Sequence, residues 1–255
     1  MEDWRFLEVE TPDRAGMNLA IEEAIFLEKT QKRIPPTVRF WRNKRAVVIG
    51  YSQKVEAEVN VKLCRDEGMD IIRRFSGGGA VYHDLGNLNY STILNADHPL
   101  VSGPDIRESY RVFSSGVVEG LRAFGVGSVL HPPSDLLVGN RKISGNAQSR
   151  KKGTVLHHGT LLVNSDLDLL ARVLDGTESP VGSGKTASRK GPVMNLVDAI
   201  GRRGDMREVK EALRRGFEKA FSVRLVQGML TPGEKKSAHA LYSEKYAKRE
   251  WNFCR

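Results

Sequence analysis

Apolar residues recur along this chain with helical spacing in several segments. From residue 17 to residue 25 they stand at positions i, i+3, i+4, i+7 and i+8, the pattern of an amphipathic helix, which is expected to end before the proline pair at 35–36. Thr231 and Pro232, with Glu234 three residues after the threonine, give the N-cap pattern of a later helix. Further helices are predicted over residues 61–67, 106–124, 167–174, 206–220 and 231–246.

Other segments carry alternating or short continuous apolar runs, which are typical of strands. Around residues 88–94, Leu88 and Tyr90 share one face while Asn87, Asn89 and Ser91 share the other, so a polar face could line a ligand cleft. Residues 42–45 are predicted to form a hairpin turn. The predicted strands are 38–40, 46–49, 70–73, 80–83, 88–94, 136–138, 141–143, 154–157, 159–164 and 223–226.

Composition limits the class of protein. A chain of 255 residues with 40% apolar residues is long enough for one large domain with a real core. Its net charge of +9 favours an acidic partner or ligand. A nucleic-acid-binding protein is one alternative, but no run of five basic residues occurs and the basic residues are spread along the chain, so we expect no nucleic-acid partner.

The chain carries two cysteines, Cys64 and Cys254, whose separation gives no metal-binding or redox spacing. A reduced, cytoplasmic setting is the simplest inference. The first ten residues mix charged and aromatic side chains and cannot form a signal peptide, and no apolar run approaches the roughly 20 residues of a membrane span. We therefore expect a soluble protein without a membrane partner.

Residues 175–192 are rich in Gly, Ser, Thr, Lys and Pro, which predicts a flexible loop or hinge and makes this segment a candidate lid over the site. Within it, Gly-Ser-Gly-Lys-Thr at 182–186 has the end of a P-loop pattern. The pattern requires a further glycine where this chain has Ser179, and no buried strand precedes it. A P-loop is therefore not favoured.

The sequence Arg-Arg-Phe-Ser-Gly-Gly-Gly-Ala-Val-Tyr-His-Asp at residues 73–84 is the first candidate site. Three consecutive glycines between two apolar runs allow a ligand to approach the backbone closely, and bare N–H groups with arginine side chains can bind phosphate or carboxylate oxygens. A glycine-rich turn with two solvated arginines is the alternative. Neighbouring residues of a strand point to opposite faces, so we expect only one of Arg73 and Arg74 to contact a ligand.

Two further motifs carry candidate chemistry. Lys142 follows a probable hairpin turn at Gly139-Asn140 and precedes small residues at 144, 145 and 147, which leaves room for a ligand beside its ammonium group, although a surface lysine is the alternative. His157 and His158 are adjacent on a predicted strand and must face opposite sides, so they cannot bind one zinc ion without distortion. We expect one histidine in the core or cleft and the other outside.

Read together, residues 73–90, 142–148 and 157–162 resemble the catalytic domain of lipoate-protein ligases, within the larger family that also holds octanoyltransferases and biotin ligases. The segments 17–20, 39–53 and 250–253 match as well, so the resemblance covers nearly the whole chain. It implies a single catalytic domain over residues 1–255 of class α/β (α+β), with a mixed, largely antiparallel sheet flanked by helices as in class II synthetases and biotin ligases.

The resemblance also implies a two-step ligation. Lipoate and ATP give lipoyl-AMP and pyrophosphate, and the lipoyl group then passes to a lysine of an acceptor, either a lipoyl domain or a glycine cleavage H-type protein. The clustered phosphate charge of the first step calls for Arg74, Mg²⁺ and glycine amides. By resemblance, Lys142 is the catalytic residue that contacts the acyl carbonyl and the α-phosphate, and Asp135 lies near the nucleotide and the magnesium ion.

The resemblance assigns the other site residues to two groups. The implied ATP and adenylate site consists of Arg74, Gly79, Ala80, Val81, Tyr82, Asp135 and Lys142. The implied lipoate site consists of Ser76, Gly77, Gly78, His83, Lys142, Gly145 and His158, with the apolar tail expected near Val81 and His83.

The chain departs from the family's pattern in two respects. Octanoyltransferases pass the acyl group through a cysteine near the matching lysine, whereas residues 125–134 contain none, so octanoyl transfer from a carrier protein is the disfavoured alternative. Many single-chain ligases carry a small C-terminal domain after the Trp-Asn-Phe ending, which is absent from this sequence. A small accessory subunit is therefore expected to replace it.

Overall fold

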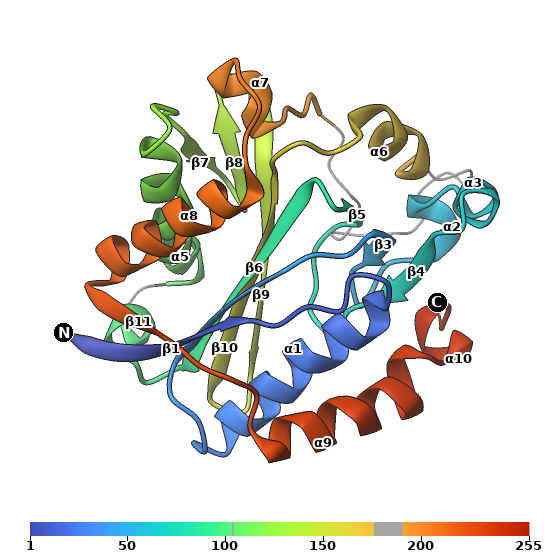
Figure 1. Ribbon diagram of the computed structural model, residues 1–255. Coiled ribbons are helices and arrows are strands. Elements are labelled where there is room, and N and C mark those ends of the chain that lie inside the picture. The colour runs from blue at the N-terminus through green and yellow to red at the C-terminus, as the bar shows by residue number, and fades with distance from the viewer. Residues whose placement is uncertain (104, 176–190, 255) are drawn as a thin grey trace.

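The protein is built on an eight-stranded sheet, seen in the computed structural model, which describes residues 1–103, 105–175 and 191–254 (Figure 1). β1 pairs in parallel with β11 and with β2, and the other neighbours are antiparallel, so the mixed, largely antiparallel sheet is confirmed. In spatial order the strands are β11 (Val223–Gln227), β1 (Glu2–Glu8), β2 (Thr37–Trp41), β6 (Asn87–Asn95), β10 (Thr154–Leu162), β9 (Arg141–Lys151), β8 (Asp135–Val138) and β7 (Val129–His131).

Helices cover both faces of this sheet (Figure 1). On one face lie α5 (Ile106–Arg122) and α8 (Met206–Phe221), and their Phe113 and Phe217 share a core with Tyr90 of β6. On the other face α1 (Ala15–Thr30) and α9 (Pro232–Leu241) pack against Ile93 and Leu156. On β6, Leu88, Tyr90 and Leu94 share the face directed at α5 and α8, as the alternation predicts, whereas Ile93 lies on the opposite face.

A second sheet of three strands lies beside the large one. Its strands are, in spatial order, β4 (Asp70–Arg73), β3 (Arg45–Ile49) and β5 (Val81–Asp84), and the helices packed on it are α2 (Val55–Glu58), α3 (Val61–Asp66) and α6 (Leu167–Val173). The predicted hairpin at residues 42–45 is wrong, because β2 pairs with β6 while β3 pairs with β4 and β5. The connection crosses between sheets and carries none of the Asn-Gly or Gly residues of tight hairpins.

The remaining elements follow the sequence prediction in most places. The last long helix begins as predicted, with Thr231 and Glu234 forming a capping box around Pro232. The predicted strands 154–157 and 159–164 are one strand, β10, which continues through Gly159. β1 was not predicted. Residues 182–186 lie outside the described part of the chain, as does most of the predicted flexible loop. The shorter elements are α4 (Pro99–Ser102), α7 (Leu196–Ile200), the π-helical turn η2 (Tyr242–Tyr246) and α10 (Arg249–Asn252).

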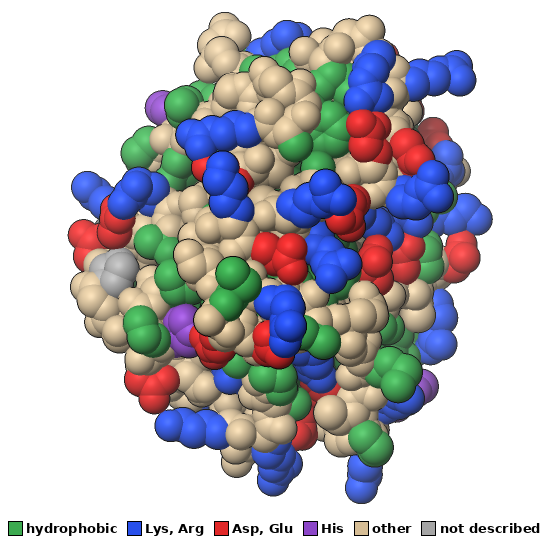
Figure 2. All heavy atoms as spheres, turned by 60° about the vertical axis from the view of Figure 1, so that its left-hand side comes forward, with side chains coloured by type: hydrophobic (Ala, Val, Ile, Leu, Met, Phe, Trp, Pro, Cys, Tyr) green, Lys and Arg blue, Asp and Glu red, His purple; other side chains and the backbone are tan. Residues whose placement is uncertain are grey.

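The basic side chains on the face that carries α5 and α8 are interleaved with acidic ones (Figure 2). Arg111 pairs with Glu108 on α5, and Lys219 of α8 reaches Glu119 at 2.8 Å. Positive charge here is divided among ion pairs, which does not favour the nucleic-acid-binding alternative. Within the described residues, no helix combines the length and apolar character that crossing a bilayer requires.

A buried ion pair joins the sheet to α9, which in turn packs against α1. Arg5 of β1 donates to Glu234 of α9 at 2.8 Å, and the two side chains are 9% and 0% exposed. Removing one partner of such a pair leaves a buried charge without compensation. The ion pair therefore holds α9 against β1, and α9 in turn packs against α1.

Glu234→Ala is expected to lower the free energy of unfolding by about 3 to 5 kcal/mol, because Arg5 then stays buried and unpaired. Asp97→Ala is the matched control, since it breaks an ion pair with Lys32 in which the side chains are 72% and 71% exposed. That control should change stability by about 1 kcal/mol or less. Urea unfolding of both variants measures the difference, and equal losses would contradict the assignment.

Candidate active site

A cavity of about 290 Å³ lies between the two sheets. The large sheet forms the floor of the cavity. Four of the floor residues lie side by side on neighbouring strands, because they are successive register partners on β2, β6, β10 and β9, namely Trp41, Asn89, Thr160 and Gly145. Its roof is the glycine-rich segment that connects β4 to β5. The site therefore has a rigid floor and an irregular roof, and the roof's shape must be held by other contacts.

Arg74 holds the glycine-rich roof from within. Its guanidinium is buried and donates to the carbonyl oxygens of Gly77 at 2.6 Å and Gly79 at 2.8 Å. Gly78 has φ +90°, and a Cβ at this position would lie 2.8 Å from Arg74 Nη2. Burial lowers the pKa of Arg74 to about 10, so the group is still cationic at neutral pH. Arg74 lines the cavity, as the sequence predicted, but its bonds shape the loop.

Arg73 lies on the other side of the loop and serves a different purpose. It is fully buried, and its Nη1 donates to the backbone carbonyls of Gly50, Tyr51 and Gln53. The Arg73 backbone oxygen accepts from Trp251 Nε1 at 2.8 Å, which ties the Trp-Asn-Phe segment to β4. Arg74 lines the cavity and Arg73 does not, and contact of Arg74 with a ligand stays a prediction. The alternative of two solvated arginines is wrong.

Lys142 enters the cavity from β9. Its ammonium lies 2.8 Å from Asp135 Oδ1 on β8, across the predicted hairpin, in which Gly139 has φ +59°. A Cβ at Gly145 would lie 2.8 Å from Lys142 Nζ, so a larger residue there would displace the end of the lysine side chain from its present position. The Lys142 backbone is also held, because its N–H donates to Pro192 O and its carbonyl accepts from Met194 N. The lysine is therefore a positioned cation and not a free surface side chain.

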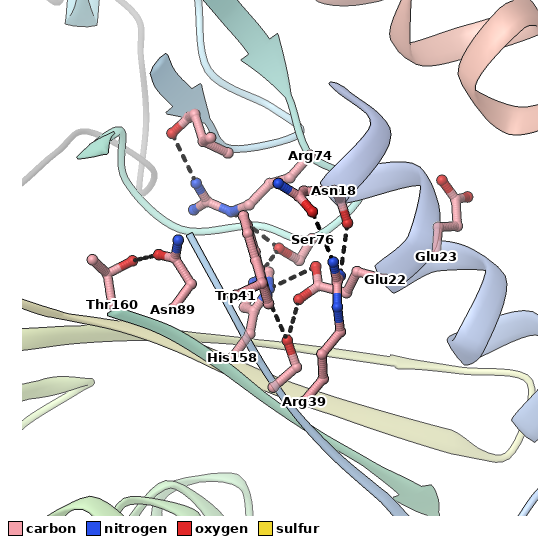
Figure 3. A network of polar contacts seen from close by, with 12 residues as sticks. Asn18, Glu22, Glu23, Arg39, Trp41, Arg74, Ser76, Asn89, His158 and Thr160 are labelled. Carbon is pink, nitrogen blue, oxygen red and sulfur yellow. Dashed lines mark hydrogen bonds and ion pairs between the residues drawn. The ribbon is translucent and has the colours of Figure 1, made fainter. Parts of the chain in front are cut away.

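Three polar side chains form a buried row under the roof (Figure 3). Glu22 of α1 is fully buried and lies 2.9 Å from His158 Nδ1, while His158 Nε2 lies 2.8 Å from Ser76 Oγ. Burial would raise the pKa of Glu22, but the interactions with His158, the hydrogen bond from Ser91 and the charge of Arg39 outweigh it, so the pKa lies below its ordinary value. Glu22 is thus a carboxylate, and it fixes the His158 ring at the cavity wall.

Both histidines of the pair are buried, so the expectation that one lies outside is wrong. His158 lines the cavity, whereas His157 stacks on Phe113 with ring centroids 4.8 Å apart on the opposite face of β10. Burial lowers the pKa of His157 well below its usual range. The prediction failed because β10 is a central strand covered by helices on both faces. Among the described residues no three His, Cys, Asp or Glu side chains gather in a way that could hold a metal ion.

Most of the predicted site residues meet at this cavity. Ser76 lies behind His158, Gly77 is in the loop next to the lining, and the Tyr82 side chain packs into the core of the small sheet. The predicted residues that line the cavity are Arg74, Gly78, Gly79, Ala80, Val81, His83, Asp135, Lys142, Gly145 and His158.

Sequence reasoning missed other parts of the wall. The polar face of β6 was noticed, and Asn89 on that face does line the cavity. Trp41 and Thr160 had no separate signal, because their place depends on strand register across the sheet. The remaining lining residues that were not predicted are Leu19, Val48, Pro133, Ser134, Asn146, Ala147 and Gly159.

The two cysteines both lie away from the cavity wall. Cys64 is buried on α3, where burial raises the pKa of its thiol to about 11. Cys254 is exposed after α10. A thiol with a raised pKa is a poor nucleophile near neutral pH. Neither cysteine is thus placed to carry an acyl group at the cavity.

Comparison with known proteins places this geometry in a family. Lipoate-protein ligase A subunit 1 of Thermoplasma acidophilum is 35% identical over 258 residues, covering 97% of this chain and 95% of that protein. Octanoyltransferase LipM of Halalkalibacterium halodurans is 31% identical over 277 residues, covering 99% of each. One relative is named as a ligase subunit and the other as a transferase, so the names alone do not choose between these two activities for this chain.

Solved structures agree with the sequence comparison. A lipoate protein ligase from T. acidophilum with bound lipoic acid has a TM-score of 0.84 at 33% identity over 100% of both chains. A structure from a study of a bipartite lipoate protein ligase and its E2 lipoyl domain from the same organism has a TM-score of 0.85 at 33% identity, covering 99% of this chain and 97% of that chain. A lipoate-protein ligase A bound with ATP has a TM-score of 0.85 at 34% identity over 99% of each chain.

The family assignment extends over most of the chain. The model of the lipoyl protein ligase A/B catalytic domain matches residues 14–218, which include the roof, the floor and the Lys142 hairpin. The relatives are named as enzymes that attach or transfer lipoyl or octanoyl groups. This chain belongs to the lipoyl protein ligase A/B catalytic domain family.

Proposed function

We propose that this chain is an ATP-dependent lipoate-protein ligase, which makes lipoyl-AMP and transfers the lipoyl group to a lysine of an acceptor domain. The observation that carries the proposal is a cavity that holds the positioned Lys142 ammonium while both cysteines lie elsewhere. Structural relatives with bound lipoic acid and with bound ATP support the pair of substrates.

The first step joins the lipoate carboxylate to the nucleotide. A carboxylate oxygen attacks the α-phosphorus of ATP, the bond to the β-phosphate oxygen breaks, and pyrophosphate leaves. In this proposal the Lys142 ammonium neutralises both the carboxylate and the α-phosphate, and the loop N–H groups near Gly79 bind phosphate oxygens, which is supported by the position of both residues at the cavity wall. We propose that the adenosine lies along the backbone of residues 79–82, while lipoate lies against Gly78, His83 and His158.

Magnesium fits the residues present if phosphate oxygens complete its coordination. Mg²⁺ usually takes one or two protein carboxylates together with phosphates and water. Asp135 supplies such a carboxylate at the cavity wall and is 14% exposed. When bound there, the ion would neutralise phosphate charge. Asp135 would then exchange some of its contact with Lys142 for the metal.

The second step transfers the acyl group to the acceptor. The acceptor lysine attacks the lipoyl carbonyl carbon as a free amine. The bond between this carbon and the phosphate oxygen of AMP breaks, AMP leaves with the electron pair of that bond, and an amide forms with release of a proton. Lys142 stays protonated and donates to the carbonyl oxygen as its negative charge develops. The same ammonium thus serves both steps.

Octanoyl transfer from a carrier protein is the second candidate, and it is favoured by the LipM relatives. It requires a nucleophile that holds the acyl group between donor and acceptor. Cys64 is buried in the core of the small sheet and Cys254 is outside the cavity. The ligase proposal therefore agrees better with the positions of the thiols.

We also propose a separate accessory subunit and a lipoyl domain or H-type protein as acceptor. The T. acidophilum relative is named as subunit 1, and it matches this chain over nearly its whole length. A structural relative is described as part of a bipartite ligase with its E2 lipoyl domain. The proposal carries that arrangement over to this chain.

Lys142→Ala is expected to leave the fold intact and to lower both pyrophosphate release and lipoyl transfer by about 100-fold to 1,000-fold, because a charge partner of the transition state is lost. Lys151→Ala, at the exposed end of the same strand, is the control and should keep activity. Circular dichroism checks folding. Full activity in Lys142→Ala would refute a catalytic role for this residue.

Replacing both cysteines, as Cys64→Ala with Cys254→Ser, is expected to leave ATP-dependent lipoylation within about threefold of the original, because neither thiol lies at the cavity. The margin allows for the stability effect of a large-to-small core change. Pyrophosphate release and mass spectrometry of the acceptor measure it. Octanoyl transfer without ATP that disappears in this variant would refute the ligase mechanism.

Adding a candidate accessory protein to the chain, ATP, Mg²⁺ and lipoate is expected to raise lipoyl-AMP formation by at least about tenfold, which corresponds to about 1.4 kcal/mol. Thin-layer chromatography of labelled AMP products follows the reaction. Complete adenylation and transfer by this chain alone, with no increase on addition, would contradict the accessory-subunit proposal and leave the ligase proposal intact.

A further inference from the structure

The Asn89 side chain lines the cavity, and its buried amide nitrogen has no hydrogen-bond partner among the described residues. The residue is 1% exposed. The other buried side-chain atoms of this kind among the described residues belong to residues outside the cavity lining. A buried donor without an acceptor is unfavourable, so an acceptor atom on a ligand bound in the cavity would be stabilised here.

The orientation of the Asn89 amide is set by a chain of hydrogen bonds that begins at Arg39. Arg39 can only donate, and its Nη2 donates to Asn18 Oδ1 at 2.9 Å. The backbone N–H of Thr11 donates to the same oxygen, which leaves Asn18 Nδ2 as the donor to Asn43 Oδ1 at 2.8 Å. The Asn43 amide nitrogen is therefore the atom that faces the His83 ring, 3.1 Å from Nδ1.

The donor-to-acceptor direction of this chain of hydrogen bonds continues from His83 to the cavity. His83 accepts at Nδ1, so its proton is on Nε2, which donates to Thr160 Oγ1 at 3.1 Å. Burial, together with the charges of Arg74 and His158, lowers the pKa of His83 to about 3, which keeps the ring neutral. Thr160 then donates to Asn89 Oδ1 at 2.7 Å (Figure 3). This chain of hydrogen bonds leaves Asn89 Nδ2 as a donor without an acceptor among the described residues.

The distance between Asn89 and the Lys142 end of the cavity corresponds to the length of an acyl chain. Lys142 Nζ lies over Gly145, and Gly145, Thr160 and Asn89 are register partners on three adjacent strands. Two interstrand spacings separate Gly145 from Asn89, or about 9.6 Å. This span is comparable to an extended octanoyl chain. Trp41, the register partner of Asn89 on β2, gives this end of the wall an apolar surface, and the apolar side chains of Leu19 and Val48 also line the cavity.

We propose that Asn89 is a specificity-determining residue that donates to a sulfur atom of the dithiolane ring of lipoate, while the lipoate carboxylate lies at Lys142. The inference rests on the proposed function, because it assumes an acyl acid in this cavity. A plain alkyl end, as in octanoate, leaves Nδ2 without an acceptor, whereas a sulfur atom supplies a weak one. His83 and Thr160 are positioning residues, since they act by holding the Asn89 amide in this orientation.

Isothermal titration of the full chain with lipoate and with octanoate tests the proposal, alongside pyrophosphate release with each acid. The original protein is expected to prefer lipoate. Asn89→Leu should reduce the ratio of the two affinities by about tenfold, the effect of a single hydrogen-bonding group that is left unpaired. Gln227→Leu, which changes an exposed amide on β11, is the matched control and should keep the ratio.

A second pair of variants covers the case in which Asn89→Leu does not fold. Thr160→Val removes the hydroxyl that holds Asn89 and should lower the preference for lipoate, whereas Thr160→Ser keeps the hydroxyl and should restore it. A purely structural role of Thr160 would weaken both acids equally in Thr160→Val. Equal weakening, or an unchanged ratio in a folded Asn89→Leu variant, would overturn the inference.

The outcomes also separate this inference from the proposed function. A lipoate preference that depends on Asn89, found without any ATP-dependent pyrophosphate release even when the candidate accessory protein is present, would support the inference and refute the ligase activity. Pyrophosphate release with an unchanged preference in Asn89→Leu would overturn the inference and support the ligase. An original protein that prefers octanoate would overturn the inference, and one that binds neither acid would overturn both.

Discussion

Three buried guanidinium groups hold together the irregular parts of this molecule. Arg39, Arg73 and Arg74 are each almost completely buried and are bonded mainly to backbone carbonyls instead of carboxylates. Loops without regular structure leave carbonyl oxygens that need donors, and the guanidinium fork supplies several in fixed directions. The glycine-rich roof, the turn at residues 50–53 and the segment after β1 all depend on these contacts.

The arginines also contribute to the charge balance of the site's interior. Arg39 and Arg74 both interact electrostatically with the buried Glu22. The contacts of Glu22 with His158 and Ser91, together with the charge of Arg39, outweigh the effect of burial and keep its pKa below the ordinary value, so Glu22 stays ionised and can fix His158, whose other nitrogen faces Ser76. The ligand cavity thus adjoins a preorganised polar layer that needs little rearrangement when a charged substrate enters.

The parts of this structure that the sequence predicts are local ones. The Lys142 hairpin, the capping box at Thr231 and the glycine-rich loop each follow from residues close together in the chain. The hairpin proposed at residues 42–45 failed because the pairing of β3 depends on two strands later in the sequence. The orientation of Asn89 depends on Arg39 through side chains from several elements, so no local pattern could indicate it.

The backbone of Lys142 is fixed on one side by a parallel bridge to Val193, between the bonds with Pro192 and Met194. Since the main chain at this residue is held, its ammonium can reach new partners by rotation about side-chain bonds alone. Such rotations in accessible side chains take picoseconds to nanoseconds, far less than domain or lid motions. Exchange of Lys142 from Asp135 to an incoming phosphate would therefore not limit the rate of a catalytic cycle.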